Sequence, residues 1–515
     1  LHLYFFTKAE RAKANHMSAN NSTANEASKR TRLRWHRFRW LLLLLFVVGY
    51  ISTFSRFESC AVEYLGLTLL SVLACCLLLS VLNRPIRFTL AVWLILFVFA
   101  VAYYFKFYLI VCNPEIVESL WFPHLYFVAE SPGILLRAYA ITTCTFSIFC
   151  FIAWLFLVLT RRMQKSISEI ELNHRFILSI LVWLIPVLMV LTGCGMYITG
   201  IARMGVPGTY LPLRLAGWMF YTRFVLIPAL LLLLVWCGDR AGLRKYSNAG
   251  IALLLLHGVS ELLLRSSRGA LLGLFMLLVL LFVCTGRMTK YRLILFIAVI
   301  IFTVLVFPVI SDYRYIRAAD EDISITKALE DSIAQQRGTS LAGTLSKTGW
   351  KIVFRITGID SLLAIQAIDF KPLGLSKLFD SSTERFYTNS VLRYPISAEH
   401  SSAPSLPGWF YLVNGAYFAV IGVSCFIILT LIFWYMLIRV RLLCQPVAQA
   451  MFLYYFVFRV MSEGNLGLLR LDVYVLIGSI AACEFVVRQG VRYRWLNNYS
   501  EASTRRIVQK NNCQS

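Results

Sequence analysis

Charged residues are scarce in this chain of 515 residues, because Asp, Glu, Lys and Arg together make up only 15% of it. Soluble globular proteins carry about 25%. Hydrophobic residues make up 59%, and the mean hydropathy is +0.70. This composition excludes a water-soluble globule built around a single core. It predicts an all-α polytopic membrane protein, since a helix satisfies its own backbone hydrogen bonds inside a bilayer.

Several motifs are also missing. The chain has no GxxxxGK[ST] loop and its glycines stand singly, which argues against an ATP motor and a dinucleotide-binding loop. None of the 13 cysteines forms a CxxC pair, and most lie in apolar runs as small hydrophobic residues. The nearest approach to an acidic metal motif, Asp320-Glu321-Asp322, is better read as the solvated start of a helix. We therefore expect no cofactor and no metal.

Twelve apolar runs approach the roughly 20 residues that cross a bilayer. The first and the eleventh are the shortest. The predicted spans cover residues 40–54, 61–82, 88–112, 134–160, 176–200, 216–237, 248–264, 269–285, 293–310, 409–438, 446–460 and 471–488.

The formal net charge of +24 comes from basic clusters in alternate loops. With twelve spans, all of these clusters fall on one side, as the positive-inside rule requires of the cytoplasmic side. The prediction is that both termini are cytoplasmic, that the partner is the lipid bilayer, and that nucleic acid is not bound. Residues 1–39 are basic and lack the apolar core of a cleavable signal peptide, so we expect the first span to direct insertion. The clusters lie at 29–39, 84–87, 161–165, 240–245, 287–292, 439–441 and 488–494.

Residues 40–310 hold the first nine predicted spans. One long external segment, 311–407, follows the ninth span. It contains no cysteine and has equal numbers of acidic and basic residues. Apolar residues at helical spacing in Ser324–Gln336 and Ser340–Ile368 predict short helices lying on the membrane face. Residues 408–488 then hold the last three spans, and we expect the basic tail 489–515 to be disordered.

The stretch 248–285 must break, because an unbroken helix would be about 57 Å long against a hydrocarbon core of about 30 Å. The break is expected at Arg265-Ser-Ser-Arg268-Gly, on the external side. Arg265 and Arg268 share one helix face at this spacing, and Glu261 lies one turn before Arg265. The alternative is that both arginines only snorkel at a span end.

Arginines recur on the external side, where the positive-inside rule does not require them. A guanidinium at a membrane surface is suited to bidentate binding of phosphate. The expected ligand is therefore a lipid-linked diphosphate held without a metal. These further arginines are Arg203, Arg214, Arg223, Arg314, Arg317 and Arg355.

Three short stretches carry a family resemblance. They are Ser267-Arg268-Gly269, Phe354–Asp360, and the Pro- and aromatic-containing stretch from His400 to Gly415. With these motifs, a dozen spans and a late external loop, the chain resembles the O-antigen polymerase (Wzy-type) family of oligosaccharide repeat-unit polymerases. The resemblance implies a GT-C-like membrane glycosyltransferase fold in the bacterial inner membrane, with the long loop in the periplasm. It also implies undecaprenyl-diphosphate-linked oligosaccharides as substrates, and a chain-length regulator and a flippase as pathway partners.

The implied reaction joins two lipid-linked repeat units, with a sugar hydroxyl attacking the anomeric carbon of the donor. The predicted catalytic residues are His400 as the base, and Arg265 and Arg268 at the leaving diphosphate. An ordinary loop histidine is the alternative for His400, and Asp360 and Glu399 are alternative bases. The predicted substrate-binding residues are Arg355, Arg314, Arg317, Arg203 and Asp360, of which Asp360 is alternatively a partner of Arg355.

Three rival functions stay open. An O-antigen ligase would use the same donor and the same arginine chemistry. A flippase or secondary transporter would place more charges deep in its spans, where this chain has mainly Glu63, Lys106, Arg137, Arg223 and His257. A structural protein of the assembly complex would catalyse nothing. External aromatics such as Trp409 and Tyr411 suit sugar stacking or, as favoured here, an interfacial belt.

Overall fold

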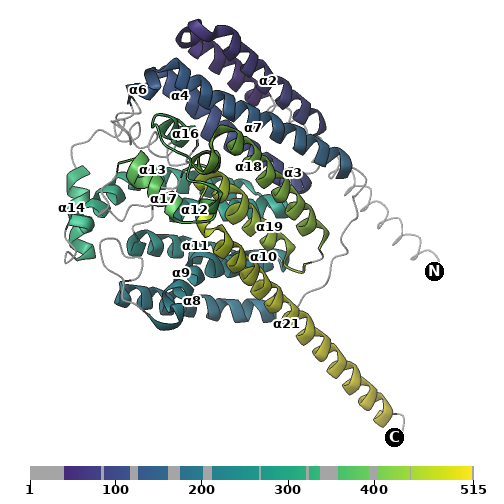
Figure 1. The fold of residues 1–515 in the computed structure, drawn as a ribbon. Coiled ribbons are helices and arrows are strands. Elements are labelled where there is room, and N and C mark those ends of the chain that lie inside the picture. The colour runs from purple at the N-terminus through teal and green to yellow at the C-terminus, as the bar shows by residue number, and fades with distance from the viewer. Residues whose placement is uncertain are drawn as a thin grey trace.

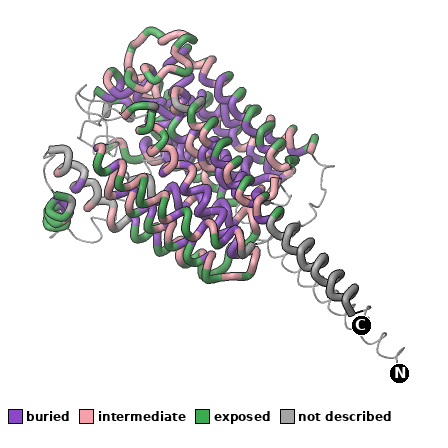
Figure 2. The backbone as a smooth tube through the Cα atoms, turned by 90° about the horizontal axis from the view of Figure 1, so that it is seen from below, coloured by how far each residue is buried: buried purple, intermediate pink, exposed green. Residues whose placement is uncertain are grey.

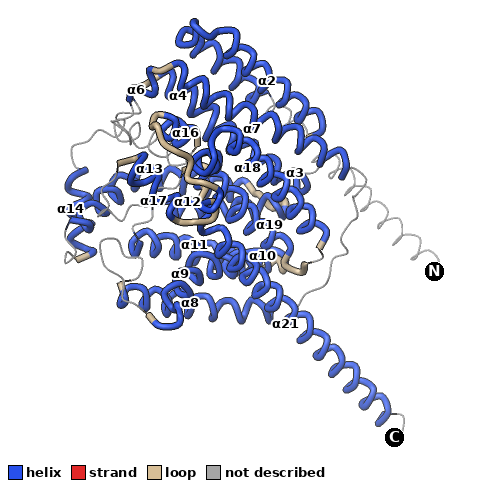
Figure 3. The backbone as a smooth tube through the Cα atoms, in the orientation of Figure 1, coloured by secondary structure: helices blue, strands red, loops and turns tan. Residues whose placement is uncertain are grey.

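The computed structural model describes residues 40–512 except 83–85, 116–125, 161–173, 201–210, 266–267, 320–323, 337–357, 394–403 and 441. Over these residues the chain consists of helices and short connections, and none of them forms a strand (Figure 3). The prediction of an all-α protein is confirmed.

Among the described residues, seven helices are long and apolar enough to cross a membrane. The fold is therefore that of a polytopic helical membrane protein, as predicted from composition. The seven helices are Trp40–Val81, Phe88–Cys112, Pro132–Leu159, Phe176–Thr199, Leu215–Arg240, Arg244–Leu264 and Leu406–Arg439.

The first of these, Trp40–Val81, folds back on itself. The turn is η1 (Phe54–Cys60), where Phe57 leaves helical geometry. Thr53 Oγ1 and Tyr64 Oη lie 2.6 Å apart across this turn, whereas residues eleven apart in one straight helix stand about 16 Å apart. The halves before and after η1 match the first two predicted spans.

The remaining predicted spans also fall within helices, but two of these helices run past the predicted limits. α13 continues to Ala319 instead of ending at 310, and α21 continues to Asn512 through the tail expected to be disordered. Residues 489–512 contain no proline, and extending an existing helix costs far less than starting one. The helices concerned are α12 (Arg268–Thr285), α13 (Lys290–Ala319), α19 (Gln445–Met451) with η9 (Phe452–Phe458) and α20 (Arg459–Glu463), and α21 (Leu466–Asn512).

The core of the bundle centres on α10 (Ile227–Arg240), in which every residue from Ile227 to Gly238 is buried. α8 (His174–Thr199) packs on α10 from outside and leaves many apolar side chains exposed. Figure 2 shows buried residues through the middle of the body and exposed turns around it. This distribution is expected of a bundle whose outer face contacts lipid.

One end of the bundle carries basic residues from several loops, and we call it the basic end. Arg292 Nη2 donates to Asp239 Oδ1 at 2.5 Å, and Arg287 donates to the Asp239 carbonyl. At the start of α19, the Glu484 carboxylate accepts the Leu443 N–H at 2.8 Å. The basic residues around 240, 287–292 and 439 therefore lie at helix ends that the topology prediction placed on one side.

The opposite end, which we call the loop end, carries residues 358–392 of the predicted long loop (Figure 1). α16 was expected on the membrane face, and the structure contradicts this. Ile359, Leu362 and Ile365 are fully buried, because α16 packs between α4 (Lys106–Cys112), α7 (Pro132–Leu159) and α18 (Leu406–Arg439). The apolar pattern of a short helix does not distinguish a membrane surface from a protein groove. The elements of the loop are α14 (Ile325–Gln336), α16 (Ile359–Gln366), η7 (Leu375–Lys377), α17 (Ser382–Phe386) and η8 (Tyr387–Val391).

α18 (Leu406–Arg439) is broken near the loop end, where Asn414 and Gly415 leave helical geometry. The carbonyls freed by the break accept backbone N–H groups of the loop, with Leu373 N 3.0 Å from Leu412 O. Trp409, expected in an interfacial belt, is fully buried and donates from Nε1 to the Leu378 carbonyl at 2.9 Å. The loop is therefore fastened to α18 by hydrogen bonds as well as by packing.

Candidate functional site

Three cations stand at π-helical turns near the loop end. Lys106 directly follows η2 (Phe99–Phe105), Arg223 lies within η6 (Thr222–Leu226), and Arg459 directly follows η9. Lys106 and Arg223 are buried, and the Arg459 side chain is 20% exposed. Short π-helical turns inside helices occur frequently at functional sites, and ionisable groups inside a membrane are functional candidates by default.

Arg223 connects three helices. Its Nε donates to Glu261 Oε1 at 2.5 Å, and its Nη2 donates to Ser260 Oγ at 2.7 Å on α11 (Arg244–Arg265). Nη1 donates to the Met189 carbonyl of α8 at 2.9 Å. The guanidinium thus has a charged partner and two neutral acceptors, as a buried charge requires.

A glycine permits this approach to α8. A Cβ on Gly193 would lie 2.7 Å from Arg223 Nη1, so a larger residue would displace the guanidinium. On the other side, His257 Nε2 lies 2.9 Å from the carbonyl oxygen of Arg223, a residue of the π-helical turn η6. The region around Arg223 is therefore built from α8, η6 and α11 together.

Arg459 holds two carboxylates. Its Nε donates to Glu463 Oε2 at 2.7 Å, and its Nη1 donates to Asp472 Oδ2 at 2.9 Å. Its Cζ also lies 4.5 Å from the centroid of the Phe224 ring, a cation–π distance. Since Phe224 follows Arg223 in the chain, the two arginine groups are neighbours at the loop end.

The third cation, Lys106, pairs with the loop. Lys106 Nζ donates to Asp360 Oδ1 at 3.0 Å, and the Lys106 side chain is fully buried. The same carboxylate oxygen accepts the N–H of Gly358, the residue just before α16, at 2.9 Å. A Cβ on Gly358 would overlap the Ala102 carbonyl of η2, so α16 begins in direct contact with that helix.

The chain folds back between α11 and α12, as the predicted break requires, because a Cβ on Gly258 of α11 would lie 3.5 Å from the Cα of Leu271 in α12. α11 ends at Arg265 and α12 begins at Arg268, with 266–267 outside the described residues. Tyr313 Oη donates to the Leu263 carbonyl at 3.3 Å. This bond brings the turn of α13 that bears Arg314 and Arg317 beside the end of α11. For these four arginines the structure describes the backbone positions.

The predicted site residues therefore divide into groups. The backbones of Arg265, Arg268, Arg314 and Arg317 gather at the break, one turn from Glu261, which pairs with Arg223. Asp360 lies on α16, away from this group, and pairs with Lys106. The predictions for Arg203, Arg355 and His400 lie outside the described residues, as does that for Glu399.

Arg459 and its carboxylate partners, Glu463 and Asp472, were not predicted from the sequence. Arg459 and Asp472 each lie at the edge of a predicted span, and a charge at a span edge is ordinarily read as a snorkelling residue. The available signal was that the topology prediction places both charges at the external ends of their spans, where the positive-inside rule does not require an arginine. The 13 positions between Arg459 and Asp472 do not by themselves predict that the two side chains pair.

The part of the chain that the structure describes holds no group of three or more His, Cys, Asp or Glu residues suited to a metal ion. In the loop, a hydrogen bond from the Lys377 ammonium, with help from the Ser382 N–H, lowers the pKa of Asp380 to about 2. This loop carboxylate therefore stays ionised at neutral pH.

Comparison of the chain with protein-family models, with curated proteins and with solved structures finds no match. The likeness to the O-antigen polymerase family stays a prediction from the sequence motifs. What the structure adds is the geometry of the loop end.

Proposed function

We propose that the protein is a membrane polymerase that joins undecaprenyl-diphosphate-linked oligosaccharide repeat units into O-antigen or a related surface polysaccharide. The observation that carries the proposal is the gathering of arginine positions at the break between α11 and α12. Two helix termini and a turn of α13 meet there, joined by the Tyr313–Leu263 hydrogen bond. Four arginines on these elements suit a ligand with several negative charges.

In the proposed reaction, a hydroxyl of the acceptor sugar attacks the anomeric carbon of the donor. The bond from that carbon to the diphosphate oxygen breaks, and undecaprenyl diphosphate leaves. Arg265 and Arg268 stabilise the negative charge that develops on the leaving oxygen. The base that takes the hydroxyl proton is His400, with Glu399 and Asp360 as alternatives; the Lys106 ion pair weighs against Asp360.

The proposed membrane arrangement is the twelve-span topology in the bacterial inner membrane, with the loop end in the periplasm and both termini in the cytoplasm. The grouping of basic loops at the basic end supports this orientation through the positive-inside rule. A chain-length regulator and a flippase of the same pathway are the proposed partners.

The test is the electrophoretic ladder of surface polysaccharide from a strain lacking the gene, complemented with wild type or with Arg265 variants. Deletion should reduce the ladder to core plus one repeat unit, because units are still transferred to the core but no longer joined. Arg265→Ala should not restore the ladder. Arg265→Lys should restore less than a tenth of it, because an ammonium lacks the bidentate fork, with protein abundance unchanged on immunoblots.

Other outcomes of the deletion identify the rival functions. Loss of the single-unit band as well would indicate a ligase or a flippase. A ladder that is unchanged by the deletion would contradict the polymerase proposal. Full activity of Arg265→Lys and Arg265→Ala would remove Arg265 from the site.

A further inference from the structure

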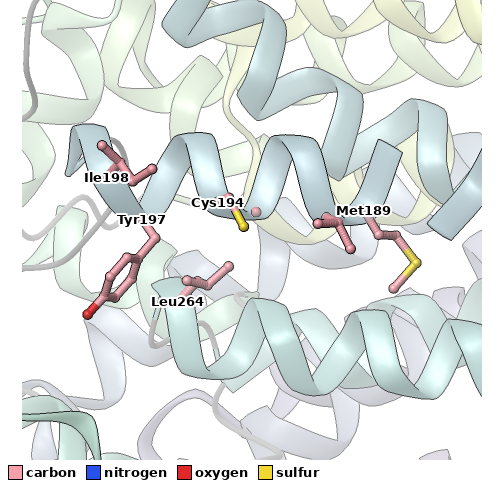
Figure 4. Close-up of a pocket in the computed structure, with 7 residues that line it drawn as sticks. Met189, Cys194, Tyr197, Ile198 and Leu264 are labelled. Atoms are coloured by element: carbon pink, nitrogen blue, oxygen red, sulfur yellow. The ribbon is translucent and has the colours of Figure 1, made fainter. Parts of the chain in front are cut away.

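An apolar groove of about 420 Å³ runs along the outside of the bundle between α8 and the end of α11. Figure 4 shows Met189, Cys194, Tyr197 and Ile198 along α8, with Leu264 of α11 facing them. Val190 and Gly193 complete the lining. From Met189 to Ile198 the groove covers about 14 Å at about 1.5 Å per residue.

The groove opens outward rather than into the bundle. Val190 is 61% exposed and Ile198 is 81% exposed, and both lie on a helix apolar enough to span a membrane. The exposed apolar walls of the groove are therefore suited to contact with a hydrocarbon chain. A polar sugar would gain no hydrogen bonds there.

The loop end of the groove meets the arginine positions. Leu264 lines the groove and the next residue is Arg265, the last of α11. Beneath the lining residue Gly193 lies the guanidinium of Arg223. A ligand that follows the groove from the middle of the bundle therefore leaves its apolar walls at the end of α11, beside the backbone position of Arg265.

We propose that this groove holds the isoprenoid chain of the lipid diphosphate, with the diphosphate beside Arg265 at the end of α11. The inference rests on the proposed function and names the place where its lipid-linked substrate docks. Charge complementarity selects this occupant, because an apolar groove whose lining residue Leu264 is followed by Arg265 matches a long hydrocarbon chain that ends in a diphosphate. An uncharged lipid would use the groove but not the arginines.

A native thiol makes the groove measurable without mutation. Cys194 lines the groove and is exposed, while Cys76 on α2 (Ala61–Val81) and Cys425 on α18 are exposed outside it. The protein in phosphatidylethanolamine nanodiscs is alkylated with a membrane-permeable maleimide, and each cysteine is followed by peptide mass spectrometry. Undecaprenyl diphosphate is the probe, with undecaprenol and phosphatidylglycerol as comparisons.

The expected result is an alkylation rate of Cys194 at least five times lower with saturating undecaprenyl diphosphate, with Cys76 and Cys425 unchanged. An unchanged Cys194 rate would overturn the proposal. Equal protection by undecaprenol or by phosphatidylglycerol would also overturn it, since the groove would then take lipid without regard to the diphosphate.

A pair of variants on one helix gives a second measurement. Val190→Trp fills the groove and should weaken protection of Cys194 by undecaprenyl diphosphate at least tenfold. Val187→Trp is the matched control, because Val187 is also exposed on α8 but does not line the groove. Equal effects of the two variants would contradict the assignment. Neither measurement requires the enzyme to turn over. Protection of Cys194 without polymer formation would therefore support the groove assignment and contradict only the proposed polymerase reaction.

Discussion

At the scale of single residues, the three cations near the loop end each have a carboxylate partner. Lys106 pairs with Asp360, Arg223 with Glu261, and Arg459 with Asp472 and Glu463. Removing one member of a buried pair leaves an uncompensated charge and costs more than replacing both members with apolar groups. The pairs should therefore be strongly coupled in mutational tests.

We predict that Glu261→Gln destabilises the protein by about 3 kcal/mol or more, because Arg223 would lose its charged partner in an apolar region. The double variant Arg223→Met with Glu261→Leu should lose less than Glu261→Gln alone. Thermal unfolding in detergent measures both. The exposed pair Lys377–Asp380 is the control, and Asp380→Asn should lower the unfolding temperature far less than Glu261→Gln does. A double variant less stable than Glu261→Gln would contradict the coupling.

The sequence indicated these residues only in part. Lys106 and Arg223 stand out as charges inside apolar runs, so they were recognisable as candidates. Their partners were not, because Asp360 is 254 positions from Lys106 and Glu261 is 38 from Arg223. Glu261 was instead assigned to Arg265, its neighbour on the same helix. Local spacing reveals contacts within a helix, whereas contacts between helices depend on how the bundle packs.

At the scale of elements, the length limit on a membrane-spanning helix predicted more of the structure than the spacing of apolar residues did. The break between α11 and α12 follows from a stretch too long to cross a bilayer unbroken, and in the structure the two helices pack against each other instead of forming one long helix. The place of α16 did not follow from its apolar pattern, since a surface helix and a buried one share it. What holds α16 in the bundle is the Lys106–Asp360 pair and the contact of Gly358 with Ala102.

We predict that Asp360→Asn loosens α16. The change removes the charge opposite buried Lys106, so backbone amides of 359–366 should exchange with deuterium at least tenfold faster. Asp369→Asn is the matched control, because Asp369 is an exposed carboxylate in the same loop. Hydrogen exchange with mass spectrometry of the purified protein measures both. If the two variants exchange alike over α16, the ion pair does not hold the loop.

At the scale of the whole molecule, the two ends of the bundle differ in kind. The basic end joins short loops through contacts such as Arg292–Asp239 and Glu484 with the Leu443 N–H. The loop end carries the three cation groups and the segment 358–392 (Figure 1). This separation is the one the charge distribution of the sequence predicted, and it places the candidate site on the side opposite the basic loops.

We predict that the loop end faces outward. A cysteine introduced at exposed Ser376 should react with an impermeant maleimide in spheroplasts, because η7 lies at the loop end. A cysteine at exposed Met288, at the basic end, should react only after the membrane is permeabilised. Labelling is read on the peptide that carries each new cysteine. The reverse pattern would invert the proposed topology.

The central claim is that this protein joins lipid-linked repeat units, and the most direct test is the reaction itself. Purified protein in proteoliposomes is given an undecaprenyl-diphosphate-linked repeat unit of a host that depends on it, in the presence of EDTA. The account predicts products longer by whole repeat units, with one undecaprenyl diphosphate released per bond formed, and at least a hundredfold less product from Arg265→Ala. A lipid-linked donor that stays unextended with correctly folded wild-type protein would contradict the account.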